Sequence, residues 1–307
     1  MPVSACAQAD YPNRPIRFIA GALPGGATDI LARAVGQKLG ESLHQQVVVD
    51  NRPGANQIIA AELTAKSSPD GYTILMVPSG FTINPALYHT LPYDPLRDFS
   101  AIALVANVPN VLVIHPSVPA RSVSEFIAYA RSKPGQLAYG TSGVGSPSHL
   151  ATALFGMMTQ LDLTHVPYKG NSQTVIDLIG GHLQLSMPAI PTAIPHVRAG
   201  RLIALGVATA QRAGALPEIP TLNEAGVKGY EVSGWYGVIG PAGIPRPLLG
   251  RLNGEINRIL GVPETHDLLA NQGADPLPGT AEQFAATIAA DIQKWKKVVA
   301  AAGIKAQ

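Results

Sequence analysis

Short apolar runs alternate along the chain with longer segments that repeat apolar residues at helical spacing. The run at residues 16–20 predicts a buried strand, and Leu31, Val35 and Leu39 then predict a helix that stops at Gly40. Further strands are predicted at residues 46–50, 72–77, 111–114, 137–139, 163–166, 183–187 and 202–207. This alternation predicts an α/β fold with mainly parallel sheets flanked by helices, whose ligands bind at the carboxyl ends of the strands.

Several predicted helices begin with a recognisable cap. Ser122 and Glu125 form a capping-box pattern, Ser146 precedes a proline at the first helical position, and Thr280 is followed by Gln283. The last helix carries an apolar stripe, which predicts core packing: Phe284, Ile288, Ile292, Trp295 and Val299.

A turn with little side chain joins the first strand to the first helix. It consists of Leu23, Pro24, Gly25 and Gly26, and the helix follows with Ala27, Thr28 and Asp29. Such a turn lets a ligand approach backbone N–H groups and the positive end of the helix, so these residues are a candidate anion site. The same residues are also compatible with a simple tight connection between strand and helix. Asp29 would then be an acidic residue favoured by the positive end of the helix dipole.

Other strand ends offer comparable loops. Thr141, Ser142 and Gly143 follow a strand and precede the Ser146 cap, so the second half of the chain repeats the form of the first turn. The loops after two further predicted strands complete the candidate site: Ser79, Gly80, Tyr168, Lys169 and Gly170.

Composition narrows the classes of function. The 307 residues are 46% apolar and 14% charged with net charge +2, which indicates a sizeable core and disfavours a nucleic-acid surface. The one cysteine, Cys6, excludes a disulfide framework, and the eight histidines lack metal-ligand spacing. We therefore expect no cofactor, no metal site and no nucleic-acid partner.

The first ten residues suggest processing. Ala5-Cys6-Ala7 and Ala7-Gln8-Ala9 both have the small-x-small form of a signal-peptidase site, although the charged region and apolar core that normally precede it are missing. We interpret residues 1–10 as the remnant of a truncated export signal, with a flexible tail as the alternative. The mature chain would then start near Asp10 or Tyr11.

Two catalytic interpretations are weaker. Ser142 resembles an elbow nucleophile, but Val144 stands where the motif needs its last glycine. Gly143 and Gly145 could open a dinucleotide fingerprint, yet Ser148 occupies the third glycine position. Of the eight histidines, His149 and His165 lie beside the ligand loops and are the candidates for a role there. We expect no enzyme; the alternative is a serine hydrolase-like activity that uses Ser142.

Taken together, many ordered motifs resemble one family, the receptors of tripartite tricarboxylate transporters, or Bug-type periplasmic solute-binding proteins. The resemblance covers Tyr11 to Ile304. It rests on these segments: Tyr11-Pro12, Pro24-Gly25-Gly26 with Thr28-Asp29, Asn51-Arg52-Pro53-Gly54-Ala55, Pro69-Asp70-Gly71-Tyr72, Asn84-Pro85-Ala86-Leu87-Tyr88, Pro92-Tyr93-Asp94, Arg97-Asp98-Phe99, His165-Val166-Pro167-Tyr168-Lys169-Gly170, Asp177-Leu178-Ile179-Gly180-Gly181, Pro220-Thr221, Glu224-Ala225-Gly226 and Gly240-Pro241-Ala242-Gly243.

The resemblance implies a two-lobed periplasmic binding protein of type II-like fold, with the ligand in the cleft. Lobe 1 would comprise residues 11–106 and 236–307, and lobe 2 residues 107–235. It implies a monomer that captures a small carboxylate through backbone N–H groups and delivers it to membrane transporter subunits. A receptor that presents its ligand to a signalling partner fits the same resemblance.

Two departures from the family pattern bear on the ligand. Asn56 and Gln57 stand where the family commonly has glycines, so their amides could reach the pocket. Near Ala189, where amino-acid-binding relatives often carry Asp or Asn, this chain has no charge. We therefore expect a dicarboxylate or an aromatic acid rather than an amino acid.

Overall fold

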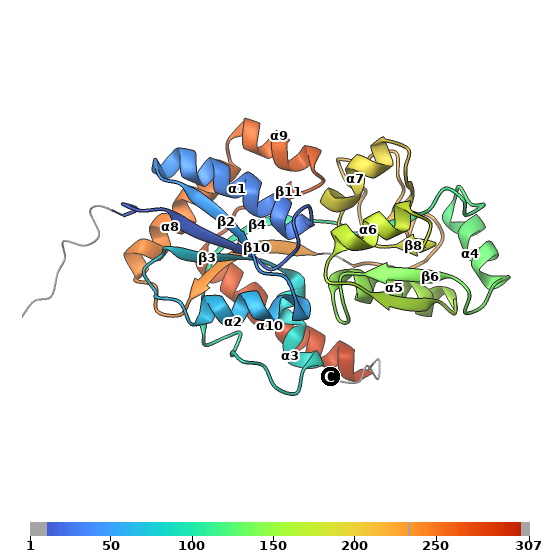
Figure 1. The fold of residues 1–307 in the computed structure, drawn as a ribbon, viewed down its shortest axis with the longest axis horizontal. Coiled ribbons are helices and arrows are strands. Elements are labelled where there is room, and N and C mark those ends of the chain that lie inside the picture. Colours follow the sequence, from blue (N-terminus) through green and yellow to red (C-terminus); the bar gives the residue numbers. More distant parts are fainter. Residues whose placement is uncertain (1–10, 233, 302–307) are drawn as a thin grey trace, which may run out of the picture.

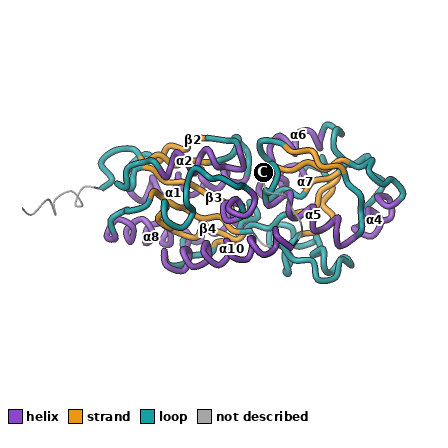
Figure 2. The backbone as a smooth tube through the Cα atoms, turned by 90° about the horizontal axis from the view of Figure 1, so that it is seen from below, coloured by secondary structure: helices purple, strands orange, loops and turns teal. Residues whose placement is uncertain are grey.

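The chain folds around two β-sheets that lie side by side along the long axis of the molecule (Figure 1). The computed structural model describes residues 11–232 and 234–301. We call the part built on the six-stranded sheet lobe 1 and the part built on the five-stranded sheet lobe 2. Seen from below, the strands of each lobe run between helices (Figure 2). The predicted export-signal remnant, residues 1–10, lies outside the described residues.

The sheet of lobe 1 has helices on both faces. Its strands run in the order β11 (Asp275–Pro276), β4 (Phe99–Asn107), β10 (Trp235–Pro241), β3 (Thr73–Pro78), β1 (Ile16–Ala20) and β2 (Val47–Asn51). One face is covered by α1 (Ala27–Leu43), α8 (Arg246–Leu260) and α9 (Pro263–Asn271). The other is covered by α2 (Ile58–Ala65), α3 (Asn84–Leu87) and α10 (Ala281–Ala301).

Lobe 2 repeats this layered arrangement. Its strands run in the order β7 (Thr164–Pro167), β6 (Ala138–Thr141), β8 (Leu185–Ser186), β5 (Val111–Ile114) and β9 (Ile203–Val207). One face packs against α4 (Val123–Arg131) and α5 (Pro147–Thr159), and the other against α6 (Asn171–Ile179) and α7 (Ile190–Arg198). Each lobe therefore has its own buried core on each face of its sheet.

The α/β class is confirmed, but both sheets are mixed rather than mainly parallel. β1 pairs in parallel with β2 and β3, whereas β10 runs antiparallel to β3 and β4. In lobe 2, β6 is parallel to β7 and β8, and β5 is antiparallel to β8 and β9. The strands β10 and β5 each adjoin a crossing between the lobes, and the short β11 also pairs antiparallel with β4.

Two chain crossings connect the lobes and lie against each other. The chain leaves lobe 1 after β4 and re-enters it at β10. The N–H of Val108 donates a hydrogen bond to the carbonyl of Gly234, with an N···O distance of 2.7 Å. The six-stranded sheet of lobe 1 includes Asn107 and Trp235, each one residue beyond the predicted lobe 1 ranges of 11–106 and 236–307. The division into these lobe ranges stays a prediction.

The predicted helix caps are confirmed, whereas one helix end and one strand differ from the prediction. Ser122 and Ser146 accept hydrogen bonds at the starts of α4 and α5. The predicted stop at Gly40 is wrong, because α1 continues to Leu43 and ends at His44 in a left-handed conformation. A Cβ at residue 40 would lie 2.9 Å from the Gln45 carbonyl, so close approach explains this glycine. The strand predicted at residues 183–187 is shorter, β8 covering Leu185–Ser186, and the helix α7 begins soon after it at Ile190.

The last helix returns to lobe 1 as its apolar stripe predicts. Thr280 and Gln283 exchange both hydrogen bonds of a capping box. Phe284 is fully buried and meets Trp235 edge to face, with ring centroids 5.2 Å apart. None of the helices in the described ranges is both long and apolar enough to cross a membrane.

The contact between α10 and β10 gives a stability prediction. In Gly237→Ala the new Cβ would lie 2.2 Å from Phe284 Cζ, so the free energy of unfolding should fall by about 1–3 kcal/mol. Gly250→Ala is the matched control, since open space surrounds this helical glycine and the helix should gain up to about 1 kcal/mol. Urea midpoints of both variants test this; equal midpoints would contradict the packing of α10 on β10.

Candidate functional site

A cavity of about 230 Å³ lies where the two lobes meet. Residues of both lobes line it, and so do Val108 and Gly234 of the two crossings. The lobes touch around it. A Cβ at Gly145 of lobe 2 would overlap Leu87 of lobe 1, and one at Gly273 would overlap Ile190. The cavity therefore lies in the closed interface, at the carboxyl ends of β1, β3 and β6.

Most of the predicted site residues line this cavity. The lining members of that set are Gly26, Ala27, Thr28, Asn56, Ser79, Ser142, Gly143, Tyr168, Lys169, Gly170 and Ala189. They come from loops far apart in sequence that the fold brings together. Their contact with a ligand stays a prediction.

The remaining predicted residues do not line the cavity, and each has another role. Leu23 packs against Gly170 of the opposite lobe, and Gly25 lies beside Ser172, so this edge of the turn closes the interface. Gly80 faces Pro147 in the same way. Thr141 is buried and contacts His165 Nε2 through its hydroxyl at 2.7 Å. Pro24, with Gly25, belongs to the outer part of the turn.

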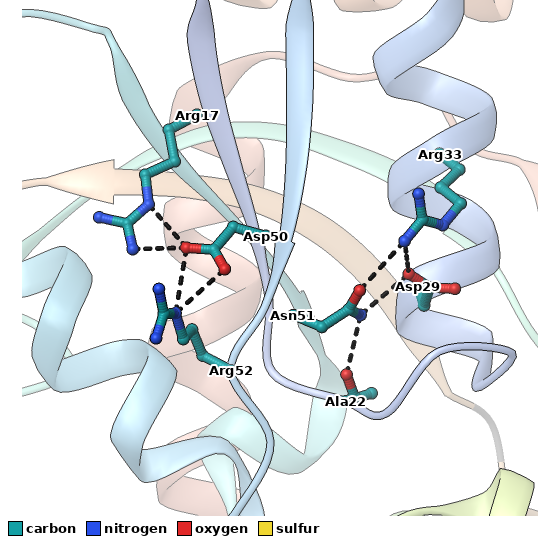
Figure 3. Close-up of polar contacts among 7 residues, drawn as sticks. All are labelled: Arg17, Ala22, Asp29, Arg33, Asp50, Asn51 and Arg52. Atoms are coloured by element: carbon teal, nitrogen blue, oxygen red, sulfur yellow. Dashed lines mark hydrogen bonds and ion pairs between the residues drawn. The ribbon is translucent and has the colours of Figure 1, made fainter.

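Asp29 supports the first turn from behind rather than facing the cavity. Its side chain is buried and accepts hydrogen bonds from the N–H of Gly25 at 2.9 Å and from Asn51 Nδ2 at 2.9 Å. Arg33 pairs with it at 2.9 Å, and Asn51 also donates to the carbonyl of Ala22 (Figure 3). Although burial opposes the charge, the hydrogen bonds from Arg33, Gly25 and Asn51 lower the pKa of Asp29. The network fixes the turn's shape, and Figure 3 shows Arg17, Asp50 and Arg52 as a separate cluster alongside.

Two helices start at the cavity with glycine as N-cap. Gly26 precedes α1 in lobe 1, and Gly170 precedes α6 in lobe 2. A glycine has no side chain with which to cap the helix. The first N–H groups to find helical acceptors belong to Ile30 and Thr174, so the preceding N–H groups of each helix have no acceptor within it. Two positive helix ends therefore face one cavity from opposite lobes.

The charge of the lining agrees with this polarity. Among the lining residues within the described ranges, Lys169 carries the only charge and no side chain is acidic. Other polar residues of the lining are neutral. Tyr236 lies against Thr28, Ser79 is buried, and Asn110 donates to the Met187 carbonyl at 2.7 Å. Burial raises the pKa of Tyr236, which keeps the phenol neutral. Such a cavity favours an anion over a cation.

The lobe 2 loop rests on a stack of rings. His149 and His165 are stacked with centroids 4.3 Å apart, and Tyr139 stacks on His165 at 4.9 Å. His149 Nδ1 accepts the N–H of Gly145 at 3.0 Å. Both histidines thus support the loop, His149 through Gly145 and His165 through Thr141, and the hydrogen bonds of the described residues pair neither of them with Ser142. The Ser142 hydroxyl is 3.2 Å from that of Ser148, so its partner is not a base that could activate it.

Several lining residues were not in the predicted set. They are Gly21, Ala22, Gly54, Ala55, Pro78, Tyr88, Val108, Asn110, Val144, Pro147, Asn171 and Gly234. Gln57, whose amide the sequence placed within reach of the pocket, also lines the cavity. Most of the others adjoin a predicted loop by one or two residues, so extending each loop would have found them. Asn110 and Tyr88 carry no such signal, because only the packing of the lobes brings them in. No cluster of three or more metal-ligating side chains occurs among the described residues.

The Asp29 network predicts a cost for removing its charge. In the wild type the two carboxylate oxygens of Asp29 accept from Gly25, Asn51 and Arg33. Asp29→Asn leaves these donors a single acceptor oxygen, so the free energy of unfolding should fall by about 1–3 kcal/mol near neutral pH. The folded-state pKa is lowered, so the wild-type advantage is present above the ordinary pKa and disappears as the pH falls through the folded value. The control Asp70→Asn removes an exposed pair with Arg14 and should cost under about 1 kcal/mol. Equal urea midpoints for the two variants would contradict this role.

The ring stack predicts a pH dependence. Burial, with a smaller effect of His149, lowers the pKa of His165 from 6.5 to about 4. Between these values the unfolded chain binds a proton that the folded chain does not, so stability falls as the pH falls from 6.5 towards 4. His165→Gln should flatten this part of the stability profile. Urea unfolding at several pH values measures the slope, and an unchanged slope would show that His165 is not responsible.

With the geometry described, similarity to known proteins can be stated. The family model for the tripartite tricarboxylate transporter family receptor matches residues 31–304. Protein BugT of Bordetella pertussis is 37% identical over 306 residues, covering 99% of this chain and 94% of BugT.

Solved structures agree over nearly the whole chain. R. palustris Rpa4515 with adipate has a TM-score of 0.94 and 38% identity, covering 97% of this chain and 100% of that one. The periplasmic binding protein BugD has a TM-score of 0.92 and 30% identity, with 97% and 100% covered. MatC from Rhodopseudomonas palustris with bound malate has a TM-score of 0.88 and 29% identity, with 94% and 100% covered. The chain therefore belongs to the tripartite tricarboxylate transporter receptor family, among the Bug-type solute-binding proteins.

Proposed function

We propose that this protein is a periplasmic receptor that captures a small dicarboxylate between its lobes for a tripartite tricarboxylate-type membrane transporter. The observation that carries the proposal is the pair of glycine-capped helix starts, α1 and α6, which face one cavity from opposite lobes. An anion with a carboxylate at each end matches two such positive ends. Adipate and malate, found with Rpa4515 and MatC, are both dicarboxylates.

The cavity supports this ligand class energetically. Hydrogen bonds to a charged group contribute about 1.5–3 kcal/mol each, and micromolar affinity needs about 8 kcal/mol. The first-turn N–H groups of two helices, together with Lys169, supply enough donors even after the cost of association. Because no described lining side chain is acidic, an amino acid would place its ammonium group without a counter-charge. Aromatic acids with one carboxylate would use only one helix end.

The same residues favour binding over catalysis. The Ser142 hydroxyl pairs with that of Ser148, whereas the two histidines of the ring stack pair with Gly145 and Thr141. Delivery to a transporter fits the family to which the chain belongs. A sensor that presents its ligand to a signalling partner would use the same closure, and the membrane partner distinguishes the two. We expect the receptor to act as a monomer, since the chain's own two lobes enclose the cavity.

The role of Lys169 tests the proposal. Calorimetric titration of ligand-stripped protein with adipate and malate should give micromolar dissociation constants. Lys169→Gln removes the charged side chain at the cavity and should weaken dicarboxylate binding about tenfold. Lys228→Gln is the matched control, because this exposed lysine of lobe 2 lies outside the cavity lining. If neither the wild type nor the control binds any dicarboxylate, the proposed function is wrong.

A further inference from the structure

One wall of the cavity has an unusual backbone. Ala55, Asn56 and Gln57 have φ values of 45°, 48° and 69°, directly after Gly54 at 127°. Left-handed conformations at consecutive non-glycine residues are uncommon, and each is strained. Glycine would adopt them without strain. A strained backbone at a cavity indicates that the side chains it carries are needed there.

The surrounding contacts fix this wall in place. Asn56 Nδ2 donates to Asn84 Oδ1 at 2.6 Å, and Asn84 Nδ2 donates back to the Asn56 carbonyl at 3.2 Å. Asn84 is buried and also donates to the hydroxyl of Tyr93 at 3.3 Å. Asn56 therefore anchors the wall to α3, and its amide is already used. The neighbouring amide of Gln57 remains for the cavity.

Gln57 lines the cavity, and its side chain lies beside Gly21 and Thr28. A Cβ at residue 21 would lie 2.7 Å from both Gln57 Cβ and Gln57 Oε1, so Gly21 makes room for this side chain. Gln57 Nε2 lies 3.4 Å from the hydroxyl of Thr28, a long contact. Gln57 Oε1 is buried and has no hydrogen-bond partner among residues 11–232 and 234–301.

A second carboxamide lines the cavity from lobe 2. Asn171 is the first residue of α6, and its Oδ1 is likewise buried without a partner in the described part of the chain. A buried polar atom without a partner is costly. Both residues line the same cavity, one from each lobe, so a rotation of either amide offers a ligand an acceptor or a donor.

We propose that Gln57 and Asn171 are specificity-determining residues that recognise a hydroxyl group, so that the ligand is a hydroxylated dicarboxylate. The proposal rests on the proposed function. A hydroxyl both donates and accepts, so it satisfies a carboxamide in either orientation of its amide, whereas a methylene satisfies neither. An ammonium group could also donate, but Lys169 and two positive helix ends face it and no described lining side chain is acidic.

The test compares ligands that differ only at carbon 2. Succinate, malate and aspartate carry hydrogen, hydroxyl and ammonium there, and adipate with 2-hydroxyadipate repeats the first pair on a longer chain. The chain length that fits the cavity is the one whose pair of acids binds more tightly. For that pair, calorimetry of the full chain should show the hydroxy acid binding at least about tenfold more tightly than the plain diacid. The reason is that the plain diacid leaves the amides of Gln57 and Asn171 unpaired. Aspartate should bind more weakly than malate.

Variants assign the preference to the two residues. Gln57→Gly keeps the left-handed turn and removes the amide, and Asn171→Ala shortens the other side chain. Each should reduce the preference for the hydroxy acid to below about threefold, because the hydroxy acid loses more affinity than the plain diacid does. Gln160→Gly is the matched control: Gln160 is also left-handed, at φ 55°, and lies outside the cavity lining. It should leave the preference unchanged.

The outcomes separate this inference from the proposed function. If diacids bind but the hydroxy acids gain nothing, or aspartate binds most tightly, the inference is wrong and the receptor function stands. If the preference exists but survives in both Gln57→Gly and Asn171→Ala, these residues do not determine it. If no dicarboxylate binds the wild type, the proposed function itself fails.

Discussion

The site depends on leaving the starts of α1 and α6 without a side-chain cap. A helix start buried without partners is normally costly, and Ser, Thr, Asp or Asn usually satisfies it. Here Gly26 and Gly170 occupy the N-cap positions. The serine-capped helix α5 shows the ordinary solution in the same molecule. The two glycines thus keep backbone N–H groups available, and Asp29 keeps the first of these turns in shape from behind.

A second constraint is how closely the lobes approach. Gly80 lies against Pro147, Gly145 against Leu87, and Gly273 against Ile190, each at a distance that leaves no room for a Cβ without a shift. Leu87 also joins an apolar cluster with Ile83, Leu150 and Val299 that includes residues of both lobes. Glycines at these points allow the backbone of one segment to contact a side chain of the opposite lobe directly. This close contact between the lobes encloses a cavity of small-molecule size.

The sequence predicted the loops of the site better than the boundaries of its elements. Strand ends followed by glycine, proline or serine identified the lining at Gly26–Thr28, Ser142–Gly143 and Tyr168–Gly170 because local chemistry decides those turns. Tyr88 and Asn110 could not be predicted, since only the packing of lobe on lobe brings them to the cavity. Gly40 was misread as a helix stop because close approach of a neighbouring loop leaves the same signal as a helix end. The direction of the strands next to the crossings depends on the global path of the chain, which no local pattern records.

Division of the donors between the lobes would make tight binding compatible with release. The N–H groups at the start of α1 belong to lobe 1, and those at the start of α6, with Lys169, belong to lobe 2. If affinity near 8 kcal/mol is shared about equally, either lobe alone retains about 4 kcal/mol, which corresponds to roughly millimolar affinity. A partner that separates the lobes would therefore weaken binding about a thousandfold without touching the ligand. Because Val108 and Gly234 of the crossings line the cavity and are hydrogen-bonded to each other, bending there changes the cavity directly.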